Sequence, residues 1–340
     1  MAHYLATVLP GLEFVLKDEI GVKIADADYQ GLERGKVHFS SKLPLEALMV
    51  LRTADNLYRP IHKFQVGPHK IHLAEIEQEI LKCDLSCAYL NGSGMISYKV
   101  NASRVGKHSY SRFDAAEAAA RGIARRSSRF CRSTAEMHEI EFRLDINCED
   151  AVFSLRLTDA SFRYRQQVRM FTQAALRPTV AHALVWFSHP EETDVFIDPF
   201  CGSGTILFER LSYPYSRMDG GDLSQEAVEA SKQNIGCHDH VGIHRWDARQ
   251  LPFASGEIDK IVTNLPFGRQ IAADEDIFAL YCDSFREMKR VLSWNGSIVC
   301  LTDAGTALKM AAERIQLNCS EETTLSLKGL HPAIFLLKKS

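Results

Sequence analysis

The chain has 340 residues, of which 46% are apolar, and a formal net charge of -3. This length exceeds one ordinary hydrophobic core, so we expect two or three domains, and the mildly acidic balance argues against indiscriminate binding to nucleic acid. No run of about 18 apolar residues predicts a membrane span, and residues 1–10 lack the basic start and apolar core of a signal peptide.

Residues 1–60 have the pattern of a small α+β unit. Alternating apolar residues predict short strands, and apolar residues with a helical period predict helices. The strands are expected at residues 3–9 and 37–39, and the helices at residues 12–20 and 45–49.

A strongly basic stretch runs from Tyr98 to Arg132. It holds nine cations and two carboxylates, a local charge of +7 that would attract a phosphate backbone. The stretch begins with an alternating strand, which continues into a basic loop containing Arg104 and Lys107.

Asp114 and Glu117 have capping-box spacing and predict the start of an alanine-rich helix. Four arginines follow at spacings of four, four and three, which would place them on one helix face. They are Arg121, Arg125, Arg129 and Arg132. A solvated surface helix is the alternative reading of this stripe.

Residues 137–147 and 151–158 alternate as two further strands, and Arg163, Tyr164 and Arg165 close this part of the chain. Strand alternation then gives way to Arg- and Gln-rich sequence. The joint with the next domain is therefore expected between residues 161 and 172.

Residues 193–197 form an apolar run that leads into Asp198-Pro199-Phe200-Cys201-Gly202-Ser203-Gly204, and residues 205–211 suit a helix. Gly202 and Gly204 thus lie where a strand turns into a helix, and they allow a ligand to approach the backbone closely. No Lys-Ser/Thr pair follows to form a phosphate loop, so a neutral or cationic adenosine derivative fits better than a triphosphate.

Two carboxylates follow at later strand ends. Asp222 comes after Gly220 and Gly221, about one βα unit further on, and can accept hydrogen bonds from both ribose hydroxyls. Asp247 ends the run from residue 243 and can accept a hydrogen bond from an adenine amino group. A lone Asp after a strand is more often a helix cap, but the ordered set favours a cofactor site.

The segment Asn264-Leu265-Pro266-Phe267 follows a strand expected at residues 258–263. An exocyclic amine on a base is a poor nucleophile because its lone pair is delocalised into the ring. The Asn264 side-chain oxygen and the Leu265 carbonyl can each accept a hydrogen bond from one of the two N–H groups of this amine. Phe267 can stack on the ring. An ordinary Asn-x-Pro turn with a core Phe is the alternative. Together with the cofactor segments, this turn indicates methyl transfer from S-adenosylmethionine.

From residue 193 onward, apolar runs alternate with helical stretches, which predicts βαβ units and a parallel sheet. The last strands are expected at residues 297–302 and 333–337, with Asn295 and Gly296 forming the turn before the first of them.

These segments resemble the Rossmann-like methyltransferases that modify exocyclic amines, whose motif is Asn/Asp-Pro-Pro-Tyr/Phe. Leu265 stands where that family has Pro, and because this position contributes a backbone carbonyl, Leu should preserve the function. Arg177-Pro178-Thr179 resembles the segment that these enzymes place at the methionine end of the cofactor; Pro178 would also suit the first turn of a helix.

The basic strand and helix resemble the THUMP domain, an RNA-binding module of tRNA-modifying enzymes, and residues 1–60 resemble the ferredoxin-like domain that precedes it. The resemblance implies an α/β chain with a ferredoxin-like domain (1–60), a THUMP domain (61–165) and a Rossmann-like methyltransferase domain (166–340). The last domain should have a mostly parallel seven-stranded sheet whose final strand is antiparallel.

The resemblance implies a tRNA methyltransferase that acts on N2 of a guanosine, most like the enzymes of position 6 in the acceptor stem. Nine scattered cysteines and the lack of a signal peptide predict a reducing cytoplasm, and a monomer is expected. The implied catalytic residues are Asn264, Leu265, Pro266 and Phe267. The implied cofactor-binding residues are Arg177, Pro178, Thr179, Asp198, Phe200, Gly202, Gly204, Thr205, Asp222, Leu223, Asp247, Ala248 and Asn264. The RNA-binding candidates are Arg104, Lys107, Arg121, Arg125, Arg129 and Arg132.

Three alternatives remain open. The first is N2 methylation at position 10 or in ribosomal RNA, and the second is a catalytically silent RNA-binding protein. A nucleotide-dependent oxidoreductase is the third, but it leaves residues 264–267 unexplained. No metal is expected, because Cys83 and Cys87 have no matching second pair.

Overall fold

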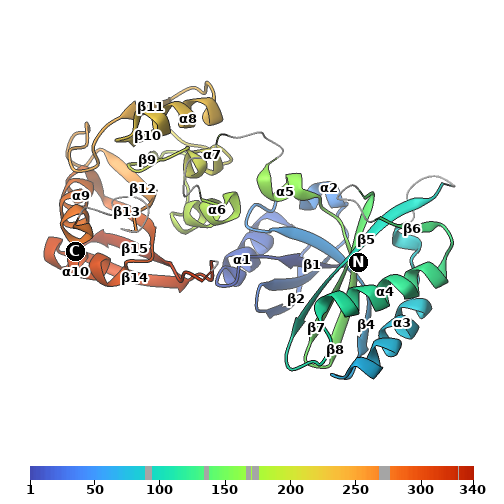
Figure 1. Ribbon diagram of the computed structural model, residues 1–340. Helices are drawn as coiled ribbons and strands as arrows, with labels where there is room; N and C mark the ends of the chain where they lie inside the picture. Colours follow the sequence, from blue (N-terminus) through green and yellow to red (C-terminus); the bar gives the residue numbers. More distant parts are fainter. Residues whose placement is uncertain (89–93, 134–137, 166–169, 171–175, 268–275, 328) are drawn as a thin grey trace.

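The computed structural model describes residues 1–88, 94–133, 138–165, 170, 176–267, 276–327 and 329–340. Two β-sheets organise the chain, an eight-stranded sheet built by residues up to 156 and a seven-stranded sheet that begins at residue 195 (Figure 1). We call residues 1–165 the front half and residues 176–340 the back half.

The sheet of the front half is mixed, with the strand order β2-β3-β1-β4-β8-β7-β5-β6. Its strands are β1 (Ala2–Thr7), β2 (Asp28–Glu33), β3 (Lys36–Ser41), β4 (Asn56–Gln65), β5 (Ile96–Val105), β6 (Phe130–Arg132), β7 (Ile140–Asn147) and β8 (Asp150–Arg156). β4 pairs with β1 on one side and with β8 on the other. The sheet is therefore continuous across the expected boundary at residue 60, which falls inside β4.

Helices pack against this sheet through two hydrophobic clusters. The helices of the front half are α1 (Glu13–Lys23), α2 (Leu45–Leu48), α3 (Leu73–Lys82), α4 (Arg112–Arg126) and α5 (Ala160–Tyr164), with short 3-10 turns at Lys70–His72 and Ser86–Ala88. α3 and α4 touch closely at Gly122, where a Cβ atom would lie 2.8 Å from the Glu77 carbonyl oxygen. A larger residue there would force the two helices apart.

The expected start of the alanine-rich helix was wrong by one turn. Ser111 caps α4, because its hydroxyl accepts from the Asp114 amide at 3.1 Å and the Asp114 carboxylate accepts from the Ser111 amide at 2.7 Å. The capping box is thus Ser111 with Asp114 rather than Asp114 with Glu117.

The second sheet has the order β11-β10-β9-β12-β13-β15-β14. Its strands are β9 (Val195–Asp198), β10 (Arg217–Asp222), β11 (Val241–Arg245), β12 (Ile258–Asn264), β13 (Leu292–Thr302), β14 (Leu317–Thr324) and β15 (Ala333–Lys339). The pairs among β9 to β13 are parallel, whereas β15 runs antiparallel to β13 and to β14. Helices on both faces bury the apolar strands.

The helices of this half are α6 (Pro178–Phe187), α7 (Thr205–Arg210), α8 (Gln225–Ile235), α9 (Ile277–Val291) and α10 (Gly305–Ile315). α6 and α7 share a hydrophobic cluster with one face of the sheet, and α9 and α10 share another cluster with the opposite face. This doubly wound arrangement leaves the carboxyl ends of the parallel strands to form a site.

The turn expected at Asn295 and Gly296 was wrong, because both residues lie inside β13. Lys260 pairs with Ser297 and Ile258 pairs with Leu292, so the strand carries an irregular bulge between these two points. The Asn-Gly pair therefore marks a bulge rather than the end of a strand.

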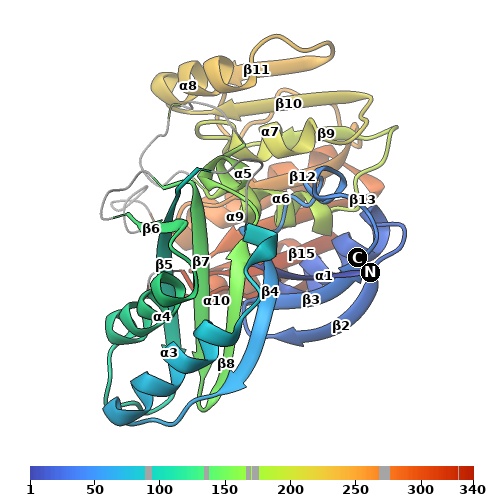
Figure 2. The same cartoon turned by 90° about the vertical axis from the view of Figure 1, so that its right-hand side faces the viewer.

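One hydrophobic cluster joins the two halves: Leu16 and Phe39 of the front half belong to the same core as Leu184 and Phe196. Figures 1 and 2 show α1 and α5 lying on the side of the front half that faces α6 and α7. Among the described residues, no helix is long and apolar enough to cross a membrane.

Candidate active site

The site lies where the strand order of the back half reverses. β9 ends at Asp198, and its two neighbours β10 and β12 end at Asp222 and Asn264. Because parallel strands present their carboxyl ends at one edge, these three side chains meet at the switch point of the sheet, the usual ligand position in such folds.

The loop after β9 has the backbone conformation that glycine permits. Gly202 and Gly204 have φ angles of 51° and 79°. A Cβ atom on Gly204 would lie 2.5 Å from Ser231 Oγ, so the loop also packs closely on α8. The Gly202 amide donates to Asp222 Oδ2 at 3.0 Å, which ties the loop to the end of β10.

Asp222 has a second partner, since its Oδ1 accepts from the Ser224 amide at 2.9 Å. Beside it, the apolar side chain of Leu223 is 55% exposed. A carboxylate next to an exposed apolar side chain suits a ribose and its attached base. The structure thus brings Asp222 and Leu223 to the glycine loop as the sequence predicted.

Asp247 is paired with its own neighbour. Arg249 Nη2 donates to Asp247 Oδ2 at 2.7 Å and Arg249 Nε donates to Oδ1 at 2.9 Å. These hydrogen bonds hold the pKa of Asp247 below its usual range. Ala248 is buried and Trp246 donates to the Pro199 carbonyl at 3.3 Å, so this segment packs directly on the loop after β9.

Asp198 is fully buried at the end of β9, and its Oδ1 accepts from the Phe200 amide at 3.2 Å. Burial raises the pKa of Asp198 to about 7. The folded protein therefore retains a proton here that the unfolded chain releases near pH 4, so this group lowers stability progressively as the pH rises toward 7.

We predict that Asp198→Asn increases the free energy of unfolding at pH 8 by up to about 4 kcal/mol and leaves it unchanged near pH 3.5. Asn cannot ionise, so the cost of a buried charge disappears. Urea denaturation at the two pH values measures the effect, and an equal change at both would contradict this origin.

The candidate catalytic turn follows β12. Leu265 and Pro266 are buried, Phe267 is partly buried, and the Leu265 amide donates to the Leu301 carbonyl at 3.0 Å. Asn264 Oδ1 is buried and has no hydrogen-bond partner among the described residues. A buried acceptor without a donor costs stability, so it is typical of a position reserved for a ligand.

Tyr281 of α9 fixes this turn, a role the sequence did not reveal. Its hydroxyl donates to the Pro266 carbonyl at 2.6 Å and lies 2.7 Å from Thr302 Oγ1, which in turn accepts from the Ala304 amide. Burial raises the pKa of Tyr281, so the hydroxyl keeps its proton.

Tyr281→Phe is expected to reduce the rate of methyl transfer about tenfold, because one hydrogen bond to the turn is lost while the ring stays in the core. Binding of S-adenosylmethionine should be unchanged. Single-turnover kinetics and calorimetry measure the two quantities, and an unchanged rate would show that the turn keeps its geometry without this bond.

The segment Arg177-Pro178-Thr179 begins α6, with Pro178 in its first turn. The Thr179 hydroxyl donates to Asp55 Oδ1 of the front half at 3.1 Å. Thr179 therefore serves the contact between the halves in this structure, at the helix end next to Arg177. Phe200 and Thr205 flank the glycine loop, Phe200 partly buried and Thr205 buried as the first residue of α7.

The expected arginine stripe is only partly helical. α4 ends at Arg126, so Arg129 lies beyond it and Arg132 belongs to β6, where Arg132 pairs with Glu117. Arg121 and Arg125 both bind Glu77 of α3, at 2.9 Å and 2.7 Å. The prediction of four arginines on one helix face was therefore wrong, because the chain turns away after Arg126.

Arg104 and Lys107 are exposed and form no ion pair within the described ranges.

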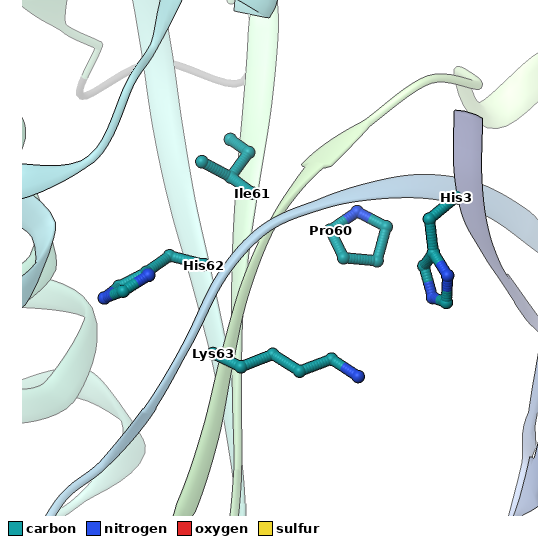
Figure 3. Close-up of a pocket in the computed structure, with 5 residues that line it drawn as sticks. All are labelled: His3, Pro60, Ile61, His62 and Lys63. Carbon is teal, nitrogen blue, oxygen red and sulfur yellow. The ribbon is translucent and has the colours of Figure 1, made fainter. Parts of the chain in front are cut away.

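Figure 3 shows a separate pocket on the front half, lined by His3, Pro60, Ile61, His62 and Lys63. Lys63 extends on the side of β4 that faces His3, whereas His62 points away and lies 2.9 Å from Glu79 Oε2. None of the candidate site residues is among these five.

The residues at the switch point fit an adenosine-type cofactor. The glycine backbone leaves room for a ligand, Asp222 and Leu223 lie beside it, and Asn264 Oδ1 has no donor among the residues described. Among all the residues that the structure describes, no group of three or more His, Cys, Asp or Glu residues could hold a metal ion. Fold and site together are those expected of a Rossmann-like methyltransferase.

Comparison with known proteins agrees. Residues 165–333 match the family UPF0020, an RMKL-like methyltransferase domain. A tRNA (guanine(6)-N2)-methyltransferase from Thermus thermophilus is 27% identical over 98% of this chain and 98% of its own length. The bovine tRNA (guanine(6)-N(2))-methyltransferase THUMP3 is 27% identical over 72% of this chain, which spans about half (52%) of that relative.

The crystal structure of TrmN from Thermus thermophilus superposes with a TM-score of 0.81 over 100% of both chains, at 24% sequence identity. This likeness confirms the expected α/β methyltransferase fold. The chain is thus similar to tRNA guanine-N2 methyltransferases, and its residues 165–333 match a methyltransferase domain.

Proposed function

We propose that this protein transfers a methyl group from S-adenosylmethionine to the exocyclic N2 of a guanosine in tRNA, at position 6 of the acceptor stem. The observation that carries the proposal is the buried Asn264 Oδ1, an acceptor without a donor among the described residues, at the strand end beside the glycine loop. The names of the relatives matched over most of this chain support the choice of guanine N2.

In this mechanism, Asn264 Oδ1 and the Leu265 carbonyl accept hydrogen bonds from the two N–H groups of the guanine amine, and Phe267 stacks on the base. The Tyr281 hydroxyl donates a hydrogen bond to the Pro266 carbonyl, and this bond holds the turn in one geometry. Bound S-adenosylmethionine supplies an electrophilic methyl carbon on a sulfonium. The cofactor would be held by the Gly202–Gly204 backbone and by Arg177, Asp222, Leu223 and Asp247.

The front half is proposed to bind the tRNA, with a ferredoxin-like domain followed by a THUMP domain. A-form RNA has a major groove too narrow to read, so recognition should depend on shape and phosphate contacts. A stem guanosine must also leave the helix to reach Asn264, at a cost of a few kcal/mol that backbone contacts can supply. Arg104 and Lys107 are the exposed cations most available for those contacts.

We predict that Arg104→Ala with Lys107→Ala weakens tRNA binding and reduces the slope of log affinity against log salt by about 2, because two phosphate contacts are lost. Filter binding across a salt series measures both. Arg286→Ala with Lys309→Ala, which removes exposed cations of α9 and α10, is the matched control. An unchanged slope in the first variant would remove these residues from the RNA interface.

The function is tested directly by incubating the protein with unmodified tRNA and labelled S-adenosylmethionine. Mass spectrometry of the nucleosides should show N2-methylguanosine, and fragment mapping should place it at position 6. A label at position 10, or in ribosomal RNA offered in parallel, would change the substrate. Calorimetry that detects no binding of S-adenosylmethionine would favour a silent RNA-binding protein.

A further inference from the structure

The loop from Arg52 to Asp55 is held between the two halves of the molecule. On the front side, Glu19 of α1 accepts from the backbone amides of Arg52 and Thr53 at 2.8 Å and 2.9 Å. On the other side, Thr53 Oγ1 lies 2.9 Å from His182 Nδ1 of α6. The loop leads directly into β4, the strand that connects both parts of the front sheet.

Glu209 of α7 is the charged centre of this contact. Its carboxylate is fully buried and accepts from Arg52 Nε at 2.7 Å and from Arg165 Nε at 3.1 Å. Arg165 also donates to the Arg52 carbonyl. Burial opposes ionisation of Glu209, yet Arg165 and Arg52 hold its pKa below the usual range.

The two arginines lie 113 residues apart in the sequence of the front half. Arg52 precedes β4, and Arg165 follows α5. Glu209 lies one turn after Thr205, where α7 begins directly behind the Gly202–Gly204 loop. Figures 1 and 2 show α5 and α7 lying close to each other where the halves meet. The carboxylate of Glu209 thus connects the front half to α7, the helix that follows the Gly202–Gly204 loop.

We propose that Glu209 is a positioning residue for methyl transfer: held by Arg52 and Arg165, it fixes the front half relative to α7, and so fixes a bound RNA relative to Asn264. This inference rests on the proposed function and assigns Glu209 no contact with RNA or cofactor. Guanidinium groups suit the role because their planar donors hold a carboxylate in a defined orientation.

A fixed orientation matters for this reaction because attack on the methyl carbon requires the amine within a narrow range of positions. A displacement of about 1 Å can reduce the rate about 100-fold even when it arises far from the reacting atoms. The contacts of Glu209 with Arg52 and Arg165 lie outside the cofactor loop and the catalytic turn. Their loss should therefore affect the chemical step more than either binding step.

The test is Glu209→Gln, which keeps the size of the side chain and removes its charge. We expect single-turnover methylation of tRNA to fall about 100-fold, while the Kd values of S-adenosylmethionine and of tRNA stay at those of the unchanged protein. Arg165→Ala should show the same pattern, and adding it to Glu209→Gln should cost little more, because both act on one contact.

Glu321→Gln, which removes an exposed ion pair with Lys309, is the control and should leave the rate unchanged. Methylation by Glu209→Gln at the full rate would overturn the positioning role. So would a parallel loss of cofactor binding, since that would assign Glu209 to the stability of α7. Failure of the unchanged protein to methylate tRNA contradicts the proposed function and is recognised before the variants are compared.

Discussion

Replacement of Asn264 by alanine is expected to lower the rate of methyl transfer about 100- to 1,000-fold, the usual effect of removing a preorganised polar group from a reaction centre. The guanine amine would lose the acceptor that directs its lone pair. Binding of S-adenosylmethionine and of tRNA should change little, because Asn264 provides only one of many contacts to either. Single-turnover kinetics with labelled cofactor measures the rate.

Asn264→Asp is the matched control for this variant. Aspartate retains an oxygen in the same place, and the motif that this turn resembles accepts Asp or Asn at this position, so part of the activity should survive. Equal activity in Asn264→Ala and in the unchanged protein would sink the proposed role of the turn.

Gly221→Ala is expected to destabilise the protein by about 3 kcal/mol, because the site has no room for a methyl group. A Cβ atom there would lie 2.1 Å from Trp246 Cε2. Trp246 adjoins Asp247 and binds the Pro199 carbonyl, so its displacement should also weaken binding of S-adenosylmethionine. Urea denaturation and calorimetry measure the two effects.

Gly21→Ala provides the comparison. Gly21 lies inside α1 and has nothing within 4 Å of the added carbon, so alanine should be neutral or stabilise the helix by up to about 1 kcal/mol. If both variants unfold at the same urea concentration as the unchanged protein, the close packing of Gly221 on Trp246 has no energetic weight.

The segments proposed to bind the cofactor could be located from the sequence because each lies at or near the end of a short strand-like segment that forms a parallel strand. Asp198, Asp222 and Asn264 come to one edge of the sheet for this reason alone. Asp247 lies two residues beyond the end of β11 rather than at the end of the strand, and the sequence did not show that Arg249 would pair with it. Two charged side chains that are close in sequence can either be solvated or form an ion pair with each other. Only the packing of the folded chain decides between these outcomes.

The basic stretch shows the opposite case. Its charge was evident, but the spacing of its arginines suggested one continuous helix face. Glu77, 44 residues before Arg121, binds two of the arginines, and α4 ends before the others. Helical spacing tells which residues share a face; it does not tell which element packs across that face or where the chain turns away.

By itself, the sequence determined the alternation of strands and helices from residue 193 onward, the position of the glycine loop, and the turn that carries Asn264. These features depend on local periodicity and on residues close together in the chain. Only the tertiary structure decided that Tyr281 supports the turn from α9 and that Arg52 and Arg165 enclose Glu209. Those contacts join residues far apart in sequence, so they exist only once the two sheets and their helices have packed together.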